Sequence, residues 1–450
     1  MAIQEIYLYR NQSSTDTTVQ SGYTSNDNFP DPATFGWSFT GHTFKEWNSS
    51  RDGTGFGYSI GTPVTTAMSE TGAKYLYYAI WQVSADPTYD SIITRTASVF
   101  TGDITNTQVS YVASGVFYNC STLTGINLPN CTTIYNAAFY CCENLSSLAF
   151  PACTTIGNSA FRDLGRSIAG MLTVSFSNCS IIGDGAFSTT SSGYAKISAI
   201  SFPKCTTIGQ YAFAEQCNLI SAAFPSCLYL GRRAFADCTK ISSFSFPKLI
   251  SILDDIKETA LDLTQGVFRL CNSLTTLNLP ACTYAGSYAF TKASALASIS
   301  LPICLAVGES AFFDLSAFSS LFAPKLTTLA ESAFAACPKL SLLILSKVTE
   351  LTYHNFCTCS SLTTLYLAAC SAIADNAFIS CSKLTSLYLL GSTVVSISST
   401  DALNGTGITS STGLIYVLTS MYTKYTGILT GGVWATEYYD RIRSTSSMPW

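Results

Sequence analysis

Cysteine has the widest chemical scope of the residue types in this chain, because a thiolate can attack a substrate, ligate a metal or form a disulfide. The 450 residues include 18 cysteines, an even number that would also suit a set of disulfides. Two sets recur in register: Cys131, Cys153, Cys179, Cys205, Cys227, Cys282, Cys304 and Cys370, and then Cys120, Cys142, Cys238, Cys271, Cys337, Cys359 and Cys381. A residue that repeats in register makes the same contact in every unit, so we expect mainly buried free thiols that fill the core. Disulfides or a metal are the alternative, above all at Cys141–Cys142 and at Cys357 and Cys359.

Other residues offer little further chemistry. The two histidines, His42 and His354, lie in different modules of the chain, so neither a His-based triad nor a two-histidine metal site is expected. Acidic residues gather at Asp254, Asp255, Glu258 and Asp262, where a solvated helical face is the preferred interpretation and a cation site the alternative. No nucleophile-elbow, phosphate-loop or dinucleotide-binding motif occurs at a place where a strand is expected to lead into a helix. We predict no catalytic residue, no metal and no cofactor; an enzyme would need an unrecognised site, for instance at Cys357 or Asp254.

Composition limits the class of protein and its partners. Only 11% of the residues are charged while 47% are hydrophobic, and the net charge is -4, so the chain is expected to fold around a large core. The 23 Lys and Arg residues stand against 27 Asp and Glu without a basic run, which argues against nucleic acid as a partner. Apolar stretches are too short for membrane insertion, and Met1–Arg10 lacks the features of a signal peptide. Either a signal has been removed, or the protein leaves its cell by another route.

The side chains named above must be positioned by internal repeats. An Ala-Phe pair, or a close variant, recurs mostly every 22 residues. Its phenylalanines are Phe117, Phe139, Phe161, Phe187, Phe213, Phe235, Phe268, Phe290, Phe312, Phe334, Phe356 and Phe378. Such a period is the signature of a leucine-rich-repeat solenoid, in which each unit packs only on its neighbours.

Each repeat predicts one strand and one return segment. A Leu-x-x-Leu-x-Leu run, such as 145–150, ends in a period-2 pattern typical of a strand, and Pro or a small residue follows it. A Cys-Thr-Thr-Ile-Gly segment then leads to Ala-Phe, which we expect to return as a short helical turn. The predicted fold is an α/β leucine-rich-repeat solenoid with a parallel sheet on one face. Insertions around 164–171, 188–196 and 249–263 are expected to bulge out without interrupting that sheet.

The 22-residue period, together with Cys-Thr-Thr-Ile-Gly and Ala-Phe-x-x-Cys, resembles the BspA-like leucine-rich repeats of bacterial surface proteins and some microbial eukaryotes. The resemblance covers residues 99–395, about 12 units of period 22. It implies a scaffold for adhesion and for binding host proteins, without naming a ligand.

Two flanking segments resemble other modules. Residues 1–81 contain Gly41-His-Thr-Phe44-Lys-Glu-Trp47 and Tyr75-Leu-Tyr-Tyr-Ala-Ile-Trp81, and they resemble the Listeria-Bacteroides repeat, a small β-grasp-like domain of surface proteins. His42 replaces the Tyr of that motif, and an extra Tyr precedes Ala79. Residues 82–98 are the expected linker. Residues 396–450 resemble the segment that closes BspA-like arrays, and they are expected to cap the apolar end of the last repeat.

One outward column of the repeat strands changes character along the rod. It contains Asn127, Ala149, Ser175, Ser201, Ala223, Ser245, Asn278, Ser300, Phe322, Ile344, Tyr366 and Tyr388, so small residues give way to large ones. Large apolar side chains side by side on an exposed sheet mark an interaction site. We hypothesise a partner-binding surface at Phe322, Leu342, Ile344, Tyr366 and Tyr388. Two alternatives stay open: the C-terminal tail covers these residues, or they reflect only the strand propensity of aromatic residues.

Two functions suit these observations. The first is a non-enzymatic adhesion protein on a bacterial cell surface, whose leucine-rich-repeat rod contacts a protein or glycan ligand on a host or other cell. The alternative is a bacteriophage virion component, such as a head or tail decoration, a fibre or a receptor-binding protein, whose partners are neighbouring virion proteins. Both place the protein outside the cell, and both allow a homo-oligomer.

Overall fold

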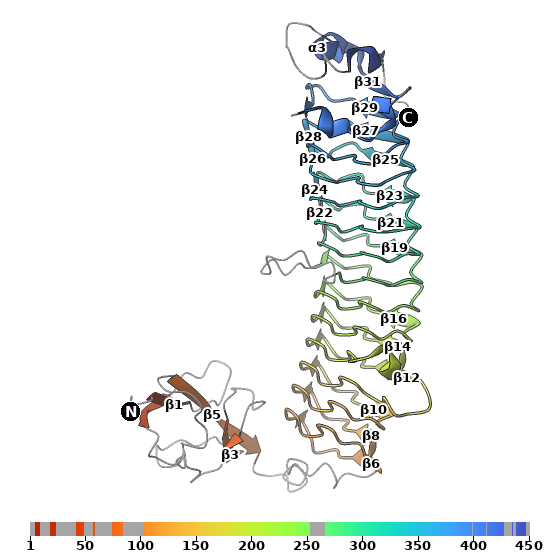
Figure 1. Ribbon diagram of the computed structural model, residues 1–450. Helices are drawn as coiled ribbons and strands as arrows, with labels where there is room; N and C mark the ends of the chain where they lie inside the picture. Colours follow the sequence, from red (N-terminus) through yellow and green to blue (C-terminus); the bar gives the residue numbers. More distant parts are fainter. Residues whose placement is uncertain are drawn as a thin grey trace.

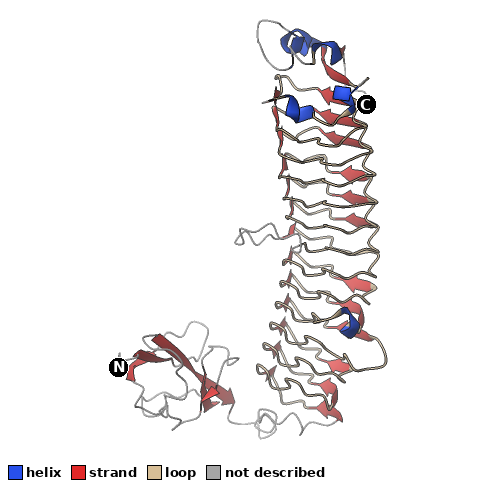
Figure 2. Cartoon of the chain, in the orientation of Figure 1, coloured by secondary structure: helices blue, strands red, loops and turns tan. Residues whose placement is uncertain are grey.

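The computed structural model describes residues 102–252, 266–397, 399–410, 412–426, 434 and 438–446, together with the backbone of five strands nearer the N-terminus (Figures 1 and 2). The acidic segment with Asp254, Asp255, Glu258 and Asp262, for which a solvated helical face was expected and a cation site was the alternative, lies outside these residues. Within them, no helix combines the length and apolar character that a membrane span needs.

The N-terminal strands form a mixed five-stranded sheet in the order β2-β1-β5-β3-β4. They are β1 (Glu5–Tyr9), β2 (Val19–Tyr23), β3 (His42–Asn48), β4 (Gly57–Tyr58) and β5 (Lys74–Val83). The β1 and β5 strands are parallel, and the other neighbours are antiparallel. Strand β5 continues two residues beyond position 81. The resemblance of this segment to the Listeria-Bacteroides repeat stays a prediction.

The described repeats stack into a rod in which most units contribute two parallel strands (Figure 1). The Leu-x-x-Leu-x-Leu runs form what we call the long-strand face. Its strands are β6 (Gly102–Thr105), β8 (Leu123–Asn127), β10 (Ser147–Ala149), β12 (Leu172–Ser175), β14 (Ile197–Ser201), β16 (Ser221–Ala223), β19 (Thr276–Asn278), β21 (Ser298–Ser300), β23 (Ser320–Phe322), β25 (Leu342–Leu345), β27 (Thr364–Leu367) and β29 (Ser386–Leu389).

The Thr-Ile pairs that follow form a second parallel array, the short-strand sheet. Its strands are β7 (Tyr111–Val112), β9 (Thr133–Ile134), β11 (Thr155–Ile156), β13 (Ile181–Ile182), β15 (Thr207–Ile208), β17 (Tyr229–Leu230), β18 (Ser251–Ile252), β20 (Tyr284–Ala285), β22 (Ala306–Val307), β24 (Thr328–Leu329), β26 (Glu350–Leu351), β28 (Ala372–Ile373) and β30 (Ser396–Ile397). The sequence predicted a sheet on one face only, because a two-residue strand is too short to show a period-2 pattern.

The insertions affect the two sheets differently. The short-strand sheet continues without a break through ten strands from β7 to β24, so it passes all three insertions. The long-strand sheet, in contrast, breaks between β10 and β12, between β16 and β19, and between β23 and β25, where there is no insertion. At the first break, Gly165 N–H and Ser167 N–H of the insertion donate to the carbonyls of Cys142 and Glu143 at 3.0 and 2.9 Å. The expectation of an uninterrupted sheet is therefore wrong for the long strands.

The return segment of each repeat is an extended series of turns, the turn face, and not the expected helical turn. In most repeats the residues two before and two after the repeat phenylalanine are left-handed; around Phe139 these are Ala137 (φ 52°) and Cys141 (φ 55°). This backbone points its N–H groups along the rod: Ala137, Phe139 and Cys141 donate to carbonyls of the next repeat at 2.7–2.9 Å. A helix would satisfy these groups internally, whereas stacked units gain a third ladder of hydrogen bonds between repeats.

The repeat phenylalanines form the centre of the core. Successive rings stack nearly parallel, for example Phe187 on Phe213 with centroids 5.2 Å apart. A second row packs edge-on against the first and contains Phe150, Phe176, Phe202, Phe224 and Phe246. One repeat alone could not bury these rings, so stacking of neighbours is what stabilises them.

The C-terminal segment closes the array as expected for a cap. Its elements are the 3₁₀ helices Thr400–Leu403, Thr419–Met421 and Tyr439–Arg441, α2 (Gly407–Ser410), β31 (Leu414–Leu418), α3 (Tyr422–Thr426) and β32 (Ile442–Thr445). Strands β31 and β32 extend the long-strand sheet in the order β25-β27-β29-β31-β32. Buried Tyr425 and Trp434 anchor the cap, since Val395 N–H donates to Tyr425 Oη at 2.8 Å and Trp434 Nε1 donates to Val395 O at 2.6 Å.

Candidate functional site

The residues of the hypothesised partner surface lie on consecutive strands of the long-strand face. Phe322 ends β23, Leu342 and Ile344 lie on β25, and Tyr366 and Tyr388 lie on β27 and β29. Parallel pairing puts Ile344 opposite Tyr366 and Tyr366 opposite Tyr388. The alternation of inward and outward side chains along each strand thus produces a column that runs along the rod.

The exposure of these side chains differs along the column. Phe322, Leu342 and Ile344 are 57%, 46% and 45% exposed, although large apolar residues elsewhere in the repeats are mostly buried. Tyr366 and Tyr388 are half-buried because their rings stack on each other, with centroids 4.3 Å apart. The described part of the C-terminal tail therefore leaves the apolar residues of the column uncovered.

The cap adds two residues that sequence reasoning did not place in the column. Tyr416 on β31 pairs with Tyr388, and their rings are 4.4 Å apart. Exposed Arg443 on β32 pairs in turn with Tyr416 and ends the series. The chain between Tyr388 and Tyr416 does not keep the 22-residue period, so the repeat count gave no register for Tyr416. The Tyr-Val pair at 416–417, which resembles a strand of the closing segment, was the sequence feature that could have placed Tyr416 in the column. We call Phe322, Leu342, Ile344, Tyr366, Tyr388 and Tyr416 the apolar column.

The cysteines take two structural roles that match their two phases in the sequence. All 18 are free thiols, and all except Cys217 and Cys357 are buried. Thiols of the first set donate to the carbonyl two residues later, as Cys304 does to Ala306 O at 3.1 Å. Thiols of the second set other than Cys120 donate to the phenylalanine carbonyl of the preceding repeat, as Cys359 does to Phe334 O at 3.0 Å. The expectation of buried free thiols in repeated contacts is confirmed.

Burial makes these thiols poor nucleophiles. It raises the pKa of Cys131 and Cys370 to about 11. It raises the pKa further, to about 12, at Cys179, Cys205, Cys227 and Cys282. Catalytic and metal-binding cysteines instead need a lowered pKa, since the thiolate is the reactive form.

The remaining candidate groups that the structure describes, His354 and Cys357, show no catalytic or metal-binding arrangement. His354 lies at a left-handed turn position with its ring beside that of Tyr353, 3.7 Å between centroids. Half-exposed Cys357 also has a pKa raised by burial. Across the described ranges, no three His, Cys, Asp or Glu side chains form a group that could hold a metal ion.

Short parallel strands, Leu-x-x-Leu-x-Leu runs and one turn of chain per repeat define a leucine-rich-repeat solenoid. The family profile "BspA type Leucine rich repeat region" matches residues 96–201, 171–261, 255–363 and 283–409. These matches together span more than half of the chain. The chain therefore belongs to the BspA-type leucine-rich-repeat family.

Several solved structures are similar to this chain. A leucine-rich-repeat protein from Bacteroides ovatus is 20% identical, with 71% of this chain and 84% of that chain covered and a TM-score of 0.48. A leucine-rich cell surface protein from Faecalibacterium prausnitzii is 21% identical, with 68% and 82% covered and a TM-score of 0.37. The leucine-rich-repeat protein of T. pallidum is 24% identical, with 39% and 76% covered and a TM-score of 0.29. No curated protein matches the chain.

Proposed function

We propose that this chain is a non-enzymatic binding protein of a bacterial cell surface, which adheres to a protein on another cell through the apolar column. The observation that supports this most directly is the exposure of Phe322, Leu342 and Ile344 on neighbouring strands. Preceding repeats place Asn278 and Ser300 at the same column position, so the change is confined to the C-terminal part of the rod.

The energetics favour a partner at this position. Leu342 and Ile344 lie on one strand and Phe322 lies on the strand of the preceding repeat, so the backbone is already ordered before a partner docks, which keeps the entropic cost of binding low. Burial of each such side chain contributes about 1–2 kcal/mol, so the three together can supply the centre of a specific interface. Stacked Tyr366, Tyr388 and Tyr416 would extend this centre as a rigid rim with hydroxyl groups at its edge.

The domain organisation supports display of the rod. We propose that residues 1–81 form a β-grasp-like module that attaches or spaces the array, that 82–98 link it to the repeats of 99–395, and that 396–450 cap the far end. In this arrangement the apolar column lies next to the cap, where a rod held by its other end reaches furthest from the surface.

A matched pair of triple variants tests the binding surface. Phe322→Ser, Leu342→Ser and Ile344→Ser combined should abolish adhesion of the labelled full chain to intact cells. The control combines Ile181→Ser, Tyr229→Ser and Leu305→Ser, which are equally exposed residues of the short-strand sheet or beside it. The control should bind like the unaltered chain, and equal loss in both triple variants would contradict the proposal.

Location tests the adhesion role against the bacteriophage alternative. A gold-labelled antibody against the repeats is applied to the producing culture, with released particles kept in the preparation, and viewed by electron microscopy. Label on cell envelopes is the expected result. Label on particles would instead make the chain a virion component, and label confined to the cell interior would contradict both functions.

A further inference from the structure

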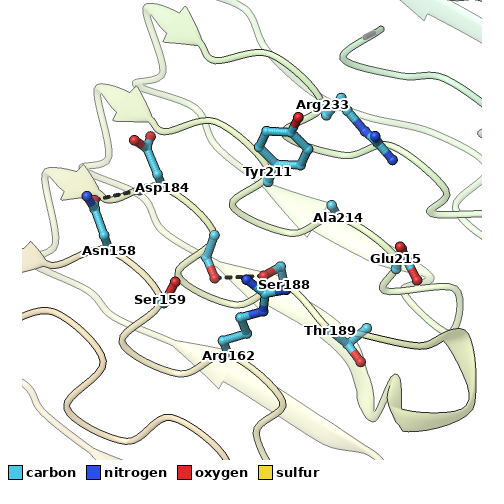
Figure 3. A pocket seen from close by; sticks show the side chains of 11 residues that line it. Asn158, Ser159, Arg162, Asp184, Ser188, Thr189, Tyr211, Ala214, Glu215 and Arg233 are labelled. Atoms are coloured by element: carbon cyan, nitrogen blue, oxygen red, sulfur yellow. Dashed lines mark hydrogen bonds between the residues drawn. The ribbon is translucent and has the colours of Figure 1, made fainter. Parts of the chain in front are cut away.

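The turn face is hollowed over the repeat of Phe187. Gly185 lies two residues before Phe187, and Thr189 lies two residues after it. Ser188 follows Phe187 directly in the sequence. These three residues are buried and small, so they form a floor. At matching positions, Arg162 of the preceding repeat and Tyr211 and Glu215 of the following repeat are larger, and they border this floor (Figure 3).

Two adjoining hollows result from this change in side-chain size. The first has a volume of 520 Å³, and its walls include Arg162 on one side and Tyr211, Glu215 and Arg233 on the other (Figure 3). The second has a volume of 660 Å³, shares Glu215 and Arg233 with the first, and adds Asp237 and Arg269. Both volumes lie within the range of small-ligand sites, about 300–1,000 Å³. We call the two together the turn-face groove.

Tyr211 lines the first hollow of the groove, and its side chain is partly exposed. Gly185 N–H donates to Gln210 O and Tyr211 N–H donates to Arg232 O, so the three repeats follow one another in register. The guanidinium groups of Arg232 and Arg233 lie over the ring, 5.4 and 5.1 Å from its centroid. They come from the repeat that follows Tyr211. Gly185 lines the same hollow as Tyr211 and has no side chain to fill it.

The polar groups of the groove balance in charge. Arg162, Arg233, Asp184 and Glu215 line the first hollow, whereas Arg233, Arg269, Glu215 and Asp237 line the second. Arg269 Nη1 donates to Asp237 at 2.6 Å. A single anion or cation therefore gains no net attraction here, while a ligand with many hydroxyl groups finds both donors and acceptors.

Arginines of the groove, Arg162, Arg233 and Arg269 among them, and one carboxylate are held at a cost to the folded chain. The Nε atoms of these three arginines are buried without a hydrogen-bond partner in the described part of the protein. Burial, with a contribution from Asp237, raises the pKa of Glu215 despite the opposing influence of Arg233 and Arg162. Groups that weaken the fold in this way are typical of binding sites rather than of structural contacts.

We infer that the turn-face groove binds an uncharged saccharide, with Tyr211 packed against a sugar ring and Arg162, Arg233 and Glu215 hydrogen-bonded to its hydroxyl groups. The apolar C–H face of a sugar suits a partly exposed aromatic ring, and the hydroxyl groups around that face suit mixed donors and acceptors. Two adjoining hollows fit two neighbouring sugars of one chain. This site is separate from the apolar column, so it does not rest on the proposed adhesion to a protein.

An array of immobilised saccharides tests the inference with the full chain. The probes are uncharged di- to tetrasaccharides of glucose, galactose, mannose and N-acetylglucosamine, and matched saccharides that carry uronic acid or sulfate. A multivalent array is chosen because an open groove of this depth binds weakly. Binding to one or more uncharged saccharides is expected, with no gain for the acidic ones.

Three variants locate the binding. Tyr211→Ala and Glu215→Gln should each lower the array signal at least tenfold, and both retain the Cβ of a residue that is already left-handed. The control is Tyr118→Ala, which removes an exposed turn-face ring stacked on Tyr140 at 4.9 Å, outside the groove. Thermal unfolding monitored by circular dichroism confirms that all three fold. Binding to none of the uncharged saccharides, to acidic ones only, or equally by all variants would overturn the inference.

Discussion

The rings of Tyr388 and Tyr416 stack face to face, with centroids 4.4 Å and planes 10° apart. Tyr388 belongs to the last long strand of the repeats, and Tyr416 belongs to the first strand of the cap. The cap thus prolongs the apolar column of the long-strand face. It closes the core of the rod without covering the proposed contact surface.

This stack predicts a stability effect at Tyr388. Tyr388→Ala removes ring contacts to both Tyr366 and Tyr416, so the free energy of unfolding should fall by about 1–3 kcal/mol. Tyr388→Phe keeps both stacks and should cost clearly less. Urea unfolding monitored by circular dichroism measures both. Equal losses in the two variants would mean that the ring contacts do not stabilise the junction.

The buried thiols predict a large difference in reactivity between the folded and unfolded chain. N-ethylmaleimide at pH 7 should modify only the half-exposed Cys217 and Cys357 of the folded protein. In denaturant all 18 cysteines should react, because all are free. Intact-mass measurement counts the additions. Few additions in denaturant would show that most cysteines are already oxidised.

The same thiols predict that alkaline pH destabilises the fold. Cys205 and Cys227 have a pKa of about 12 in the folded chain, against about 8.5 for an unfolded thiol. Their contribution is complete below the unfolded pKa and is lost as pH rises toward 12, since only the unfolded state then releases protons. The slope is about 1.4 kcal/mol per pH unit for each thiol.

Urea unfolding at a series of pH values between 8 and 10.5 measures how steeply the free energy of unfolding declines with pH. Cys227→Ala should make the decline shallower, because one of the titrating thiols is gone while the tyrosines that also ionise in this range remain. An unchanged slope in Cys227→Ala would contradict the raised pKa of that thiol.

The left-handed turns predict opposite effects at two adjacent alanines. Ala137 has a φ of 52°, where a Cβ costs about 1–2 kcal/mol, so Ala137→Gly should leave stability unchanged or raise it by up to about 1 kcal/mol. Ala138 is fully buried and is not left-handed, so Ala138→Gly should lower stability by about 1 kcal/mol. Thermal unfolding of both variants measures these two effects. A loss of stability in Ala137→Gly would contradict the left-handed conformation of Ala137.

Repetition explains why much of this fold could be predicted from the sequence. The phases of Cys131 and Cys142 already indicated two different core contacts, and the series from Asn278 to Tyr388 followed the real register of the long strands. The turn type was not predictable, because Ala137 and similar residues are not left-handed by propensity. Hydrogen bonding between stacked repeats imposes that conformation.

The candidate sites were also predictable from the sequence only in part. Phe322 and Ile344 could be found because their column keeps the repeat period, whereas Tyr416 could not, because the cap departs from it. The turn-face groove depends on side-chain sizes at several positions of three consecutive repeats, such as Arg162, Gly185 and Tyr211. Only the three-dimensional stacking brings those positions together.

The most direct test of the apolar column as a contact surface is site-specific photo-cross-linking in intact cells. The photoreactive residue p-benzoylphenylalanine replaces Phe322 in one full-length chain and Leu305, exposed beside the short-strand sheet, in another. We predict that irradiation joins a partner protein to the chain labelled at position 322 and not to the chain labelled at position 305. Equal products at both positions, or none at position 322 in cells to which the chain adheres, would contradict the proposed binding surface.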